Sequence, residues 1–531
     1  MLATELKAQI ENLCRIGIAL SSERDIDVLL EMIVDESRRF TRADAGTLYS
    51  VSEDGKHLDW KIVQNDSMET RIGGTSSIKV DKTVFPLVPL VTDGQVNLSN
   101  VSTYVANTGQ AVNIPDVYEA EGFDFTGPRQ YDEATGYRSR SMLVVPLRNH
   151  EDDNIGVLQL LNAQDSEKKV IPFSSDYENL VTSLASQAAI GITNARLIQD
   201  LENLFDSFIQ TIAAAIDEKS PYTAGHVRRV VELTMMIAEQ INGSKDGLWG
   251  KVRFGTDELN ELRIAAWMHD VGKITTPEYV VDKSTKLETI YDRLETIRTR
   301  YEILIRDAEI SSLKKKLEVR GGEGESDVLD RIEEEFQRQV SALREELAFI
   351  TQCNTGGEFM ADEHIDRLAG IAGHIKSNGD LHNRLTEDEV YNLSIRKGTL
   401  TEEERQIINN HAAVGIKMLT QLPFSKKLGQ VPRYAGGHHE KLNGKGYPGG
   451  LTADQLPLQA RIMAVADIFE ALTAPDRPYR RPMPLSQALK IMGFMVKDQE
   501  LDHKIVDLVV ESGLALKYAK KELNADQVDV E

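Results

Sequence analysis

Histidine and aspartate recur in several short motifs between residues 216 and 516. The motifs are "GHVRR", "WMHDVGK", "NNHAAV", "GGHHEKLNGKGYP" and "AVADIFEA", which supply His226, His269, Asp270, His411, His438, His439 and Asp467. Any one of these side chains alone is most simply explained as a hydrogen-bonded core residue. Three of them lie in stretches of predicted apolar helix, where burying an unpaired imidazole or carboxylate would cost several kcal/mol, so a common partner explains the whole set better. Imidazole and carboxylate groups bind divalent iron, manganese, zinc or nickel, so the set predicts a metal centre without cysteine.

The order and local context of these motifs resemble those of the HD-GYP phosphodiesterases, a bacterial branch of the HD metal-dependent phosphohydrolases. The resemblance covers about residues 216–516 apart from an insert. It implies an all-helical bundle that hydrolyses cyclic di-GMP, a bacterial second messenger, with two or three iron or manganese ions. It also implies one ion held by His226, His269, Asp270 and Asp467, and a second held by His411, His438 and His439.

Asp270 and Lys273 are the catalytic residues that the resemblance implies. The Asp270 carboxylate has two oxygens and would bridge the two ions, which lower the pKa of a shared water and bind the phosphoryl oxygens. Lys273 would neutralise a non-bridging phosphate oxygen or help to protonate the leaving group. The alternative for Lys273 is a surface lysine without a role in catalysis.

Two segments are expected to contact the substrate. The turn after the paired histidines would line the groove through Gly446, Tyr447 and Pro448, because glycine frees the backbone and proline restricts it. By the resemblance, Arg477 and Arg480 in "TAPDRPYRRPMP" would bind phosphate or guanine, for which a planar guanidinium is suited. The alternative is that both arginines are exposed loop residues.

The expected metal count follows from one departure from the family pattern. Family members with three metals usually carry a glutamate four residues before the first histidine of the set, where this chain has Tyr222. Two divalent ions are therefore expected, iron or manganese by the resemblance, with zinc and nickel as the alternatives.

The first 176 residues mix helix and strand signals. "AGTLYSVS", "SMLVVPLRN" and "NIGVLQLLNAQ" predict strands, so residues 1–176 are expected to form an α+β domain with an antiparallel sheet and flanking helices. About residues 18–197 resemble GAF domains, which are small-molecule sensors. Asn162, Phe173, Asp176 and Glu178 echo the signature of cyclic-nucleotide-binding members, but Ala163 stands where lysine is usual. A small-molecule or cyclic-nucleotide ligand is one hypothesis, and a domain that only dimerises is the other.

Long helical patterns organise the rest of the chain. Residues 177–217 are predicted to form one linker helix with a heptad-like apolar seam, which pairs with a second copy in a homodimer or packs on its own domain. Residues 218–516 would form the all-helical phosphodiesterase domain. Within it, residues 284–380 are predicted to form an antiparallel coiled-coil hairpin, beginning with Leu287 and Ile290, that serves as a spacer or a docking arm. Residues 517–531 are predicted to be a frayed polar tail.

Composition limits the partners and the location. The 531-residue chain has a net charge of −23, which argues against duplex nucleic acid as a partner because phosphate backbones attract a basic surface. The two cysteines lie in unrelated segments and indicate neither disulfides nor a thiolate metal site. A signal-peptide pattern and a run of about 18 apolar residues are both lacking, so a cytoplasmic protein without a membrane segment is expected.

These features lead to one main hypothesis and its alternatives. The chain would be a cyclic di-GMP phosphodiesterase, releasing pGpG or GMP, whose activity depends on a sensor domain coupled through the linker helix. A non-catalytic cyclic di-GMP receptor is the alternative from another class. Within the enzyme class, another cyclic dinucleotide or linear pGpG stays open as the substrate, because guanine recognition depends on the shape of the pocket.

Overall fold

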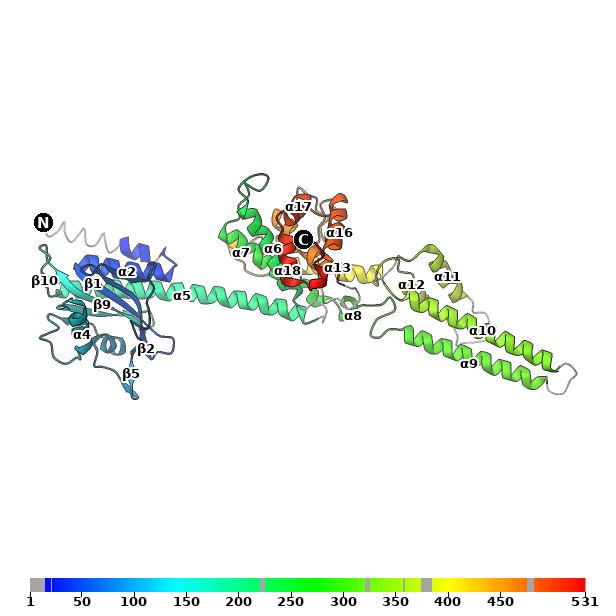
Figure 1. The fold of residues 1–531 in the computed structure, drawn as a ribbon, viewed down its shortest axis with the longest axis horizontal. Helices are drawn as coiled ribbons and strands as arrows, with labels where there is room; N and C mark the ends of the chain where they lie inside the picture. Colours follow the sequence, from blue (N-terminus) through cyan, green and yellow to red (C-terminus); the bar gives the residue numbers. More distant parts are fainter. Residues whose placement is uncertain are drawn as a thin grey trace. The chain divides into compact units, whose positions relative to one another are not determined.

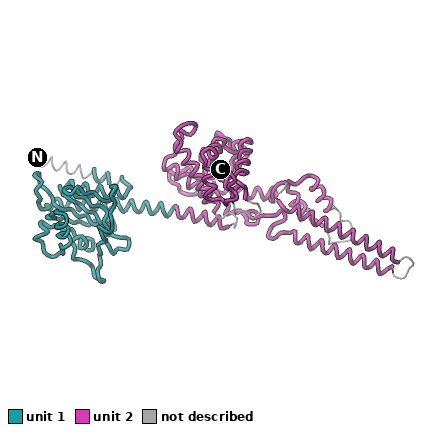
Figure 2. Tube along the Cα trace, viewed as in Figure 1, with its two compact units in different colours: residues 1–205 teal, residues 206–531 magenta. Residues whose placement is uncertain are grey.

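The chain divides into two compact units, residues 1–205 and 206–531 (Figure 2). The computed structural model describes residues 15–20, 22–219, 225–319, 325–356, 359–373, 384–474 and 482–530. The boundary between the units falls inside α5 (Ser175–Asp217), a helix of 43 residues. The predicted long helix is thereby confirmed, and it begins two residues earlier than expected.

Unit 1 is built on one antiparallel sheet, as predicted. Its strand order is β3-β2-β1-β9-β8-β7, with β4 and β10 added beside β2 and β9. The strands of the main path are β1 (Ala43–Val51), β2 (His57–Asn65), β3 (Thr70–Gly73), β7 (Val112–Ile114), β8 (Met142–Arg148) and β9 (Asn154–Gln164). The hairpin between β8 and β9 turns at the acidic stretch that was expected to connect these two strands.

Both faces of the sheet are buried, because side chains that alternate along a strand point to opposite faces. Leu143 and Leu158 lie in the cluster with α2 (Ile26–Thr41) and the first part of α5. Val144 and Val157 lie in the cluster with α3 (Val101–Thr108). Helices therefore cover the two faces of the central strands, as Figure 1 shows.

Unit 2 is all-helical around its buried centre. The elements that carry or support the predicted ligands are α6 (His226–Gly243), α7 (Thr256–Met268), η1 (Val271–Thr275), α13 (Glu402–Thr420), α14 (Val431–Gly436), α15 (Leu458–Thr473), α16 (Leu485–Lys497), α17 (His503–Glu511) and α18 (Leu514–Glu522). Helix α6 packs against α7 and α15, and α13 packs against η1 and α14. These contacts bring together segments that are far apart in the sequence.

The insert contains two long helices that lie side by side (Figure 1), α9 (Leu294–Glu318) and α10 (Glu325–Cys353). Tyr301 and Leu343 are buried in a core that these helices share with α11 (Asp362–Gly373) and α12 (Glu387–Leu393). That core reaches Leu393, and the predicted bounds of the insert, about residues 284–380, stay a prediction. The coiled-coil geometry of the pair stays a prediction.

The predicted start of the first insert helix was wrong. Leu287 and Ile290 continue the apolar spacing of three and four, but they precede α9, and Ile290 is 96% exposed. The Asp292 carboxylate accepts a hydrogen bond from the Leu294 N–H at 2.9 Å, which is the local signal that starts a helix. Apolar spacing alone therefore extended the predicted helix past its real beginning.

The end of the chain is folded, contrary to the predicted frayed tail at residues 517–531. Helix α18 runs to Glu522, and a short helix, η3 (Ala525–Gln527), follows it. Gln527 is buried, and its Nε2 donates to the carbonyl oxygens of Thr473 and Met483 at 2.9 and 3.0 Å. Through these two hydrogen bonds the tail contacts both Thr473, the last residue of α15, and Met483, which lies shortly before α16.

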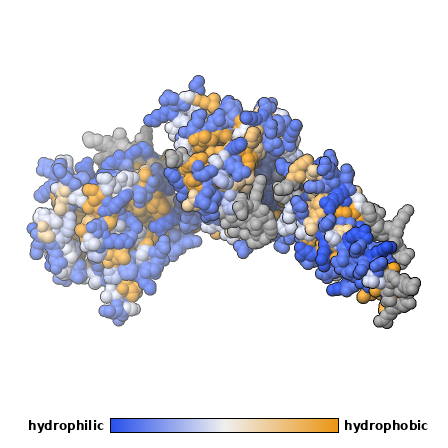
Figure 3. Space-filling model, turned by 45° about the vertical axis from the view of Figure 1, so that its right-hand side comes forward, coloured by the Kyte–Doolittle hydropathy of each residue, from blue (hydrophilic) through white to orange (hydrophobic). Residues whose placement is uncertain are grey.

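Among the residues described, none of the helices combines the length and the apolar character that a membrane span requires. On the face that Figure 3 shows, hydrophilic residues dominate and hydrophobic residues gather in separate patches.

The Gln527 side chain is expected to stabilise unit 2. Replacing it by alanine (Gln527→Ala) leaves two carbonyl oxygens without their donor, which should cost about 1–3 kcal/mol of unfolding free energy. Thermal unfolding measures the effect, with Asp526→Ala at the exposed neighbouring position as the control. Equal unfolding midpoints for the two variants would contradict the role given to Gln527.

Candidate metal centre

The seven predicted ligands come together although they lie on separate elements. His226 is the first residue of α6, His269 follows the last residue of α7, and Asp270 precedes η1. The others are His411 in α13, Asp467 in α15, and His438 and His439 just after α14. Potential ligand atoms lie within 4.8 Å of one another in three groups: His411, His438 and His439; His226, His269 and Asp467; His269, Asp270 and His438.

The Asp270 carboxylate lies at the centre of the cluster. Its Oδ1 is 3.3 Å from His411 Nε2 and 4.0 Å from His438 Nε2. Its Oδ2 is 3.3 Å from His269 Nε2 and 3.5 Å from His226 Nε2. The two oxygens therefore face imidazoles from different groups, which is the arrangement that a bridging carboxylate requires.

Backbone carbonyls orient three of the imidazoles. The Nδ1 atoms of His269, His411 and His438 lie 2.7, 2.6 and 2.5 Å from the carbonyl oxygens of Ala266, Ile408 and Ala435, each three residues earlier. An Nδ1–H that donates to this carbonyl leaves Nε2 as a bare acceptor directed at the cluster.

The inward atoms of the cluster are buried and unpaired. The Nε2 atoms of His269, His411 and His438, together with Asp270 Oδ1, lack a hydrogen-bond partner within the described part of the chain. A buried polar atom without a partner costs about 1–3 kcal/mol. Such acceptors directed at one another fit divalent cations, which would satisfy them.

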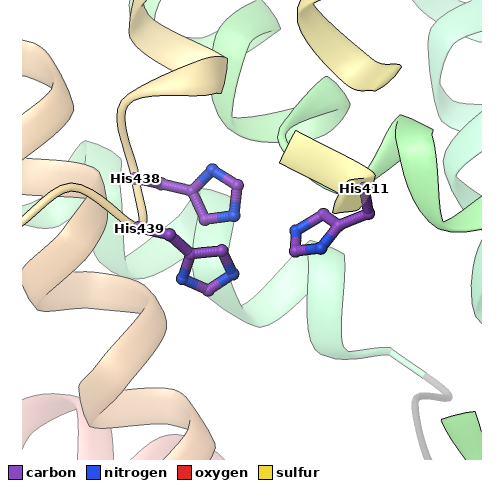
Figure 4. A group of neighbouring side chains, drawn as sticks. All are labelled: His411, His438 and His439. Atoms are coloured by element: carbon purple, nitrogen blue, oxygen red, sulfur yellow. The ribbon is translucent and has the colours of Figure 1, made fainter. Parts of the chain in front are cut away.

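The imidazoles of His411, His438 and His439 converge from two sides (Figure 4). Burial lowers the pKa of all three, and for His438 and His439 the neighbouring histidines lower it further, to about 3 for His438. All three are therefore neutral near pH 7. A neutral imidazole is the form that binds a metal ion.

His226 is held by two charged residues that the sequence analysis missed. Its Nδ1 lies 2.5 Å from Glu470 Oε2, and the Arg229 Nε donates to Glu470 Oε1 at 2.7 Å. Burial opposes the charged form of His226, but the Glu470 carboxylate outweighs it and raises the pKa of His226 to about 10. The sequence did hold a signal for these two residues. Arg229 follows His226 by three positions and Glu470 follows Asp467 by three positions, so each lies on the same helix face as a proposed ligand.

Lys273 contacts the central carboxylate directly. Its Nζ donates to Asp270 Oδ2 at 2.6 Å. Burial would raise the pKa of Asp270, but the neighbouring Lys273 ammonium holds it well below its usual value, so the carboxylate is ionised. The Lys273 ammonium is thus placed beside the cluster, as expected from the sequence, and its catalytic role stays a prediction.

One glycine permits the close approach that assembles the cluster. A Cβ on Gly272 would lie 1.9 Å from the His411 carbonyl oxygen, so only glycine lets η1 pack directly on α13. This approach sets the distance between Asp270 and His411. The sequence motif "HDVGK" contains the glycine, but its packing partner could not be identified without the fold.

The turn after the paired histidines folds back beside them. A Cβ on Gly446 would lie 2.3 Å from the Lys441 backbone nitrogen, and the buried Glu440 carboxylate accepts hydrogen bonds from the N–H groups of Gly449 and Leu451. The Tyr447 ring centre is 4.8 Å from that of His439, and the Tyr447–Pro448 bond is cis.

Some of the residues that were predicted to contact the substrate lie in the described part of the chain, and others do not. Gly446, Tyr447 and Pro448 lie next to the cluster, and their role in lining a substrate groove stays a prediction. Arg477 and Arg480 lie outside the described residues, and so does Tyr222, on which the expected metal count rests.

In unit 1, the residues that echo a cyclic-nucleotide signature make local hydrogen bonds. The Asn162 side chain accepts from the Arg140 N–H and donates to the Arg138 carbonyl. Asn113 Nδ2 donates to the Phe173 carbonyl and to Glu178 Oε2. The Asn162 and Glu178 side chains thus have partners within the unit, and a ligand of this unit stays a prediction.

Family models match both units. A GAF domain model matches residues 25–192, and HD domain models match residues 223–355 and 386–505. Among curated proteins, 97 residues are 46% identical to 3'3'-cGAMP-specific phosphodiesterase 3 of Vibrio cholerae, covering 18% of this chain and 20% of that protein. The 3'3'-cGAMP-specific phosphodiesterase 1 of the same organism is 35% identical over 142 residues, covering 27% and 31%.

A cyclic di-GMP phosphodiesterase of Thermotoga maritima is 26% identical over 226 residues, covering 40% of this chain and 58% of that protein. The similarity therefore spans between about one fifth and three fifths of the length of these relatives.

Glu470 is expected to support metal binding through His226. The change Glu470→Gln keeps the shape but removes the carboxylate that accepts from His226 Nδ1 and orients the ring, so divalent metal affinity should fall by about 10- to 100-fold. Isothermal titration with Mn²⁺ measures the affinity. The matched control is Glu239→Gln, an exposed position on α6, and an affinity loss no larger than in this control would contradict the role of Glu470.

Metal binding is also expected to release protons at pH 7. The raised pKa of His226 means that the metal-free protein holds a proton there, and a nitrogen that binds a metal must lose it. Affinity should therefore fall as the pH decreases. Calorimetric titrations with Mn²⁺ in two buffers of different ionisation enthalpy measure the released protons, and identical apparent enthalpies would contradict the expectation.

Proposed function

We propose that this chain, in which an N-terminal GAF domain precedes an HD domain, is a metal-dependent phosphodiesterase of guanine-containing cyclic dinucleotides. The observation that carries the proposal is the Asp270 carboxylate, whose two oxygens face separate sets of imidazoles with unpaired Nε2 atoms. Such a donor set is suited to two divalent ions that share one carboxylate.

The ligands are assigned to two ions. One ion would be held by His226, His269, Asp270 and Asp467, and the second by His411, His438, His439 and Asp270. Iron or manganese is proposed, with zinc and nickel as alternatives, because the donors are nitrogen and oxygen only. When bound, the ions would supply Lewis acidity, which makes water a nucleophile at neutral pH and neutralises phosphoryl oxygens.

The protein side chains would orient the substrate and move the proton. Water adds to phosphorus, the bond from phosphorus to the 3' oxygen breaks, and that oxygen takes up a proton. Lys273, held 2.6 Å from Asp270, is the proposed group that neutralises the phosphate or gives this proton. Arg477 and Arg480 would bind phosphate or guanine, and Gly446, Tyr447 and Pro448 would line the groove.

Two substrates are candidates within this class. Cyclic di-GMP is the substrate that the motif pattern implies, and 3'3'-cGAMP is named for two of the relatives. Both contain a guanine and two 3'–5' phosphodiester bonds, so the same metal chemistry suits either. The products would be the linear dinucleotide, pGpG for cyclic di-GMP, or the mononucleotides.

Unit 1 and α5 are assigned regulatory and assembly roles in this proposal. The GAF domain would bind a small molecule or a cyclic nucleotide. On α5, Leu197, Leu201, Leu204 and Phe208 are 56–66% exposed at spacings of four, three and four. Such a stripe suits a heptad seam, so a second copy is the proposed partner in a homodimer. The α9–α10 pair would be a coiled-coil spacer.

Replacing Asp270 by asparagine tests the activity. Asp270→Asn removes the shared charge, so turnover of cyclic di-GMP or 3'3'-cGAMP by Mn²⁺- or Fe²⁺-loaded protein should fall at least about 100-fold. Product analysis by chromatography measures it, with Asp507→Asn at an exposed position of α17 as the control.

Two results would overturn this proposal. Equal turnover by Asp270→Asn and the control would remove the assigned chemistry. Tight binding of either dinucleotide without turnover by the metal-loaded wild-type protein would identify a receptor instead of an enzyme.

A further inference from the structure

The segment that ends α5 contacts the turn that follows Asp270. Lys219 lies two residues beyond the end of α5, and its Nζ donates to the carbonyl oxygens of Lys273, Ile274 and Thr276 at 3.1, 2.7 and 2.6 Å. These carbonyls belong to the end of η1 and to Thr276, the residue that follows it, and the Lys273 carbonyl also accepts the Thr276 N–H at 3.0 Å. A lysine ammonium there forms charge-assisted hydrogen bonds that fix the position of the turn.

Asp217 makes a complementary contact on the other side. It is the last residue of α5, and its carboxylate accepts hydrogen bonds from the backbone N–H groups of Gly225 and Val227. These two residues flank His226 at the start of α6, a helix of 18 residues. An anion is favoured at this end of a helix because its first N–H groups are unpaired.

The two contacts fix two different segments that carry proposed ligands. Asp217 holds the backbone of His226, and Lys219 holds the turn that begins at Asp270. These are the two segments whose side chains meet where His226 Nε2 lies 3.5 Å from Asp270 Oδ2. A shift of the last turn of α5 would therefore change the separation of two proposed ligands.

The same part of α5 is anchored along its length. Asp206 accepts two hydrogen bonds at 2.8 Å from Arg263 of α7, the helix that ends just before His269. Ile209, Ala213 and Ile216 follow at spacings of four and three on the same face and are buried. This end of α5 is thus joined to α7 through Asp206 and presents a buried apolar face.

We infer that Lys219 and Asp217 are positioning residues for the metal cluster, joining the end of α5 to the His226 and Asp270 segments. The inference rests on the proposed function for its catalytic consequence. Neither residue is needed as a ligand, since Lys219 acts on backbone carbonyls and Asp217 on backbone N–H groups. Their effect on the reaction is through the placement of Asp270, Lys273 and His226.

The test replaces Lys219 in the full-length protein and uses two readouts. Lys219→Met keeps the length of the side chain but removes its donors, whereas Lys219→Arg keeps both donors and charge. Lys219→Met should lower kcat at least about tenfold, since small displacements of catalytic groups are costly, with KM and the unfolding midpoint little changed. It should also alter the visible absorption of the Co²⁺-loaded protein, which reports metal coordination geometry. Lys219→Arg should restore both, and Lys504→Met, at an exposed lysine of unit 2, is the control.

The outcomes separate this inference from the proposed function. Unchanged kcat and an unchanged Co²⁺ spectrum in Lys219→Met would overturn the inference and leave the phosphodiesterase intact. If the wild-type protein hydrolyses neither dinucleotide, the proposed function fails, and the Co²⁺ spectrum still decides whether Lys219 positions the cluster. Should Lys219→Met not fold, Lys219→Gln, which keeps amide donors without the charge, decides by the same readouts, with an intermediate effect expected and none contradicting the inference.

Discussion

The ionised Asp270 carboxylate is the group on which the rest of the site depends. It is 3% exposed, and a buried carboxylate is costly unless cations and hydrogen-bond donors compensate for the lost water. Lys273 supplies one positive charge at Oδ2. On the other side, Oδ1 faces Nε2 atoms that are acceptors themselves, so hydrogen bonds cannot balance it. A divalent cation between these acceptors resolves the conflict, which is why the site is most simply explained as a metal centre.

The Asp270 carboxylate and His226 both lie at ends of helices, and the fold brings these ends close together. Asp270 lies where α7 gives way to η1, and His226 begins α6. The absence of a side chain on Gly272 brings η1 against α13 and its His411. Carbonyl groups one turn earlier in the chain set the orientation of three imidazoles, and Glu470 does so for His226. Four of the proposed ligands are therefore held by a neighbour that is not itself a ligand, which is the support that a preorganised metal site needs.

Much of the site was predictable because residue types and their order carry its chemistry. The seven ligand candidates were found from their motifs, and the antiparallel sheet and the long helix followed from the alternation and spacing of apolar residues. Glu470 was missed because it meets His226 only when α6 and α15 pack together, 244 residues apart in the sequence. The i, i+3 spacing from Asp467 placed Glu470 on the same helix face as a proposed ligand, but its partner could not be identified without the fold.

Two predictions, the start of the first insert helix and the frayed tail, were wrong for the same reason. The spacing of apolar residues along the sequence does not show which groups form hydrogen bonds. The first insert helix was predicted too early because Leu287 and Ile290 kept the spacing, although Asp292 starts the helix only at Leu294. The tail was predicted to be frayed because it is polar overall, but it contains Tyr518, Ala519 and Gln527, which are buried within unit 2.

Anomalous diffraction from Mn²⁺-loaded crystals tests the central claim most directly, because it locates the ions without reference to activity. The structure predicts two peaks about 3.5–4 Å apart that share the Asp270 carboxylate, one beside His226, His269 and Asp467 and the other beside His411, His438 and His439. A single peak, or peaks that do not contact Asp270, would contradict the account.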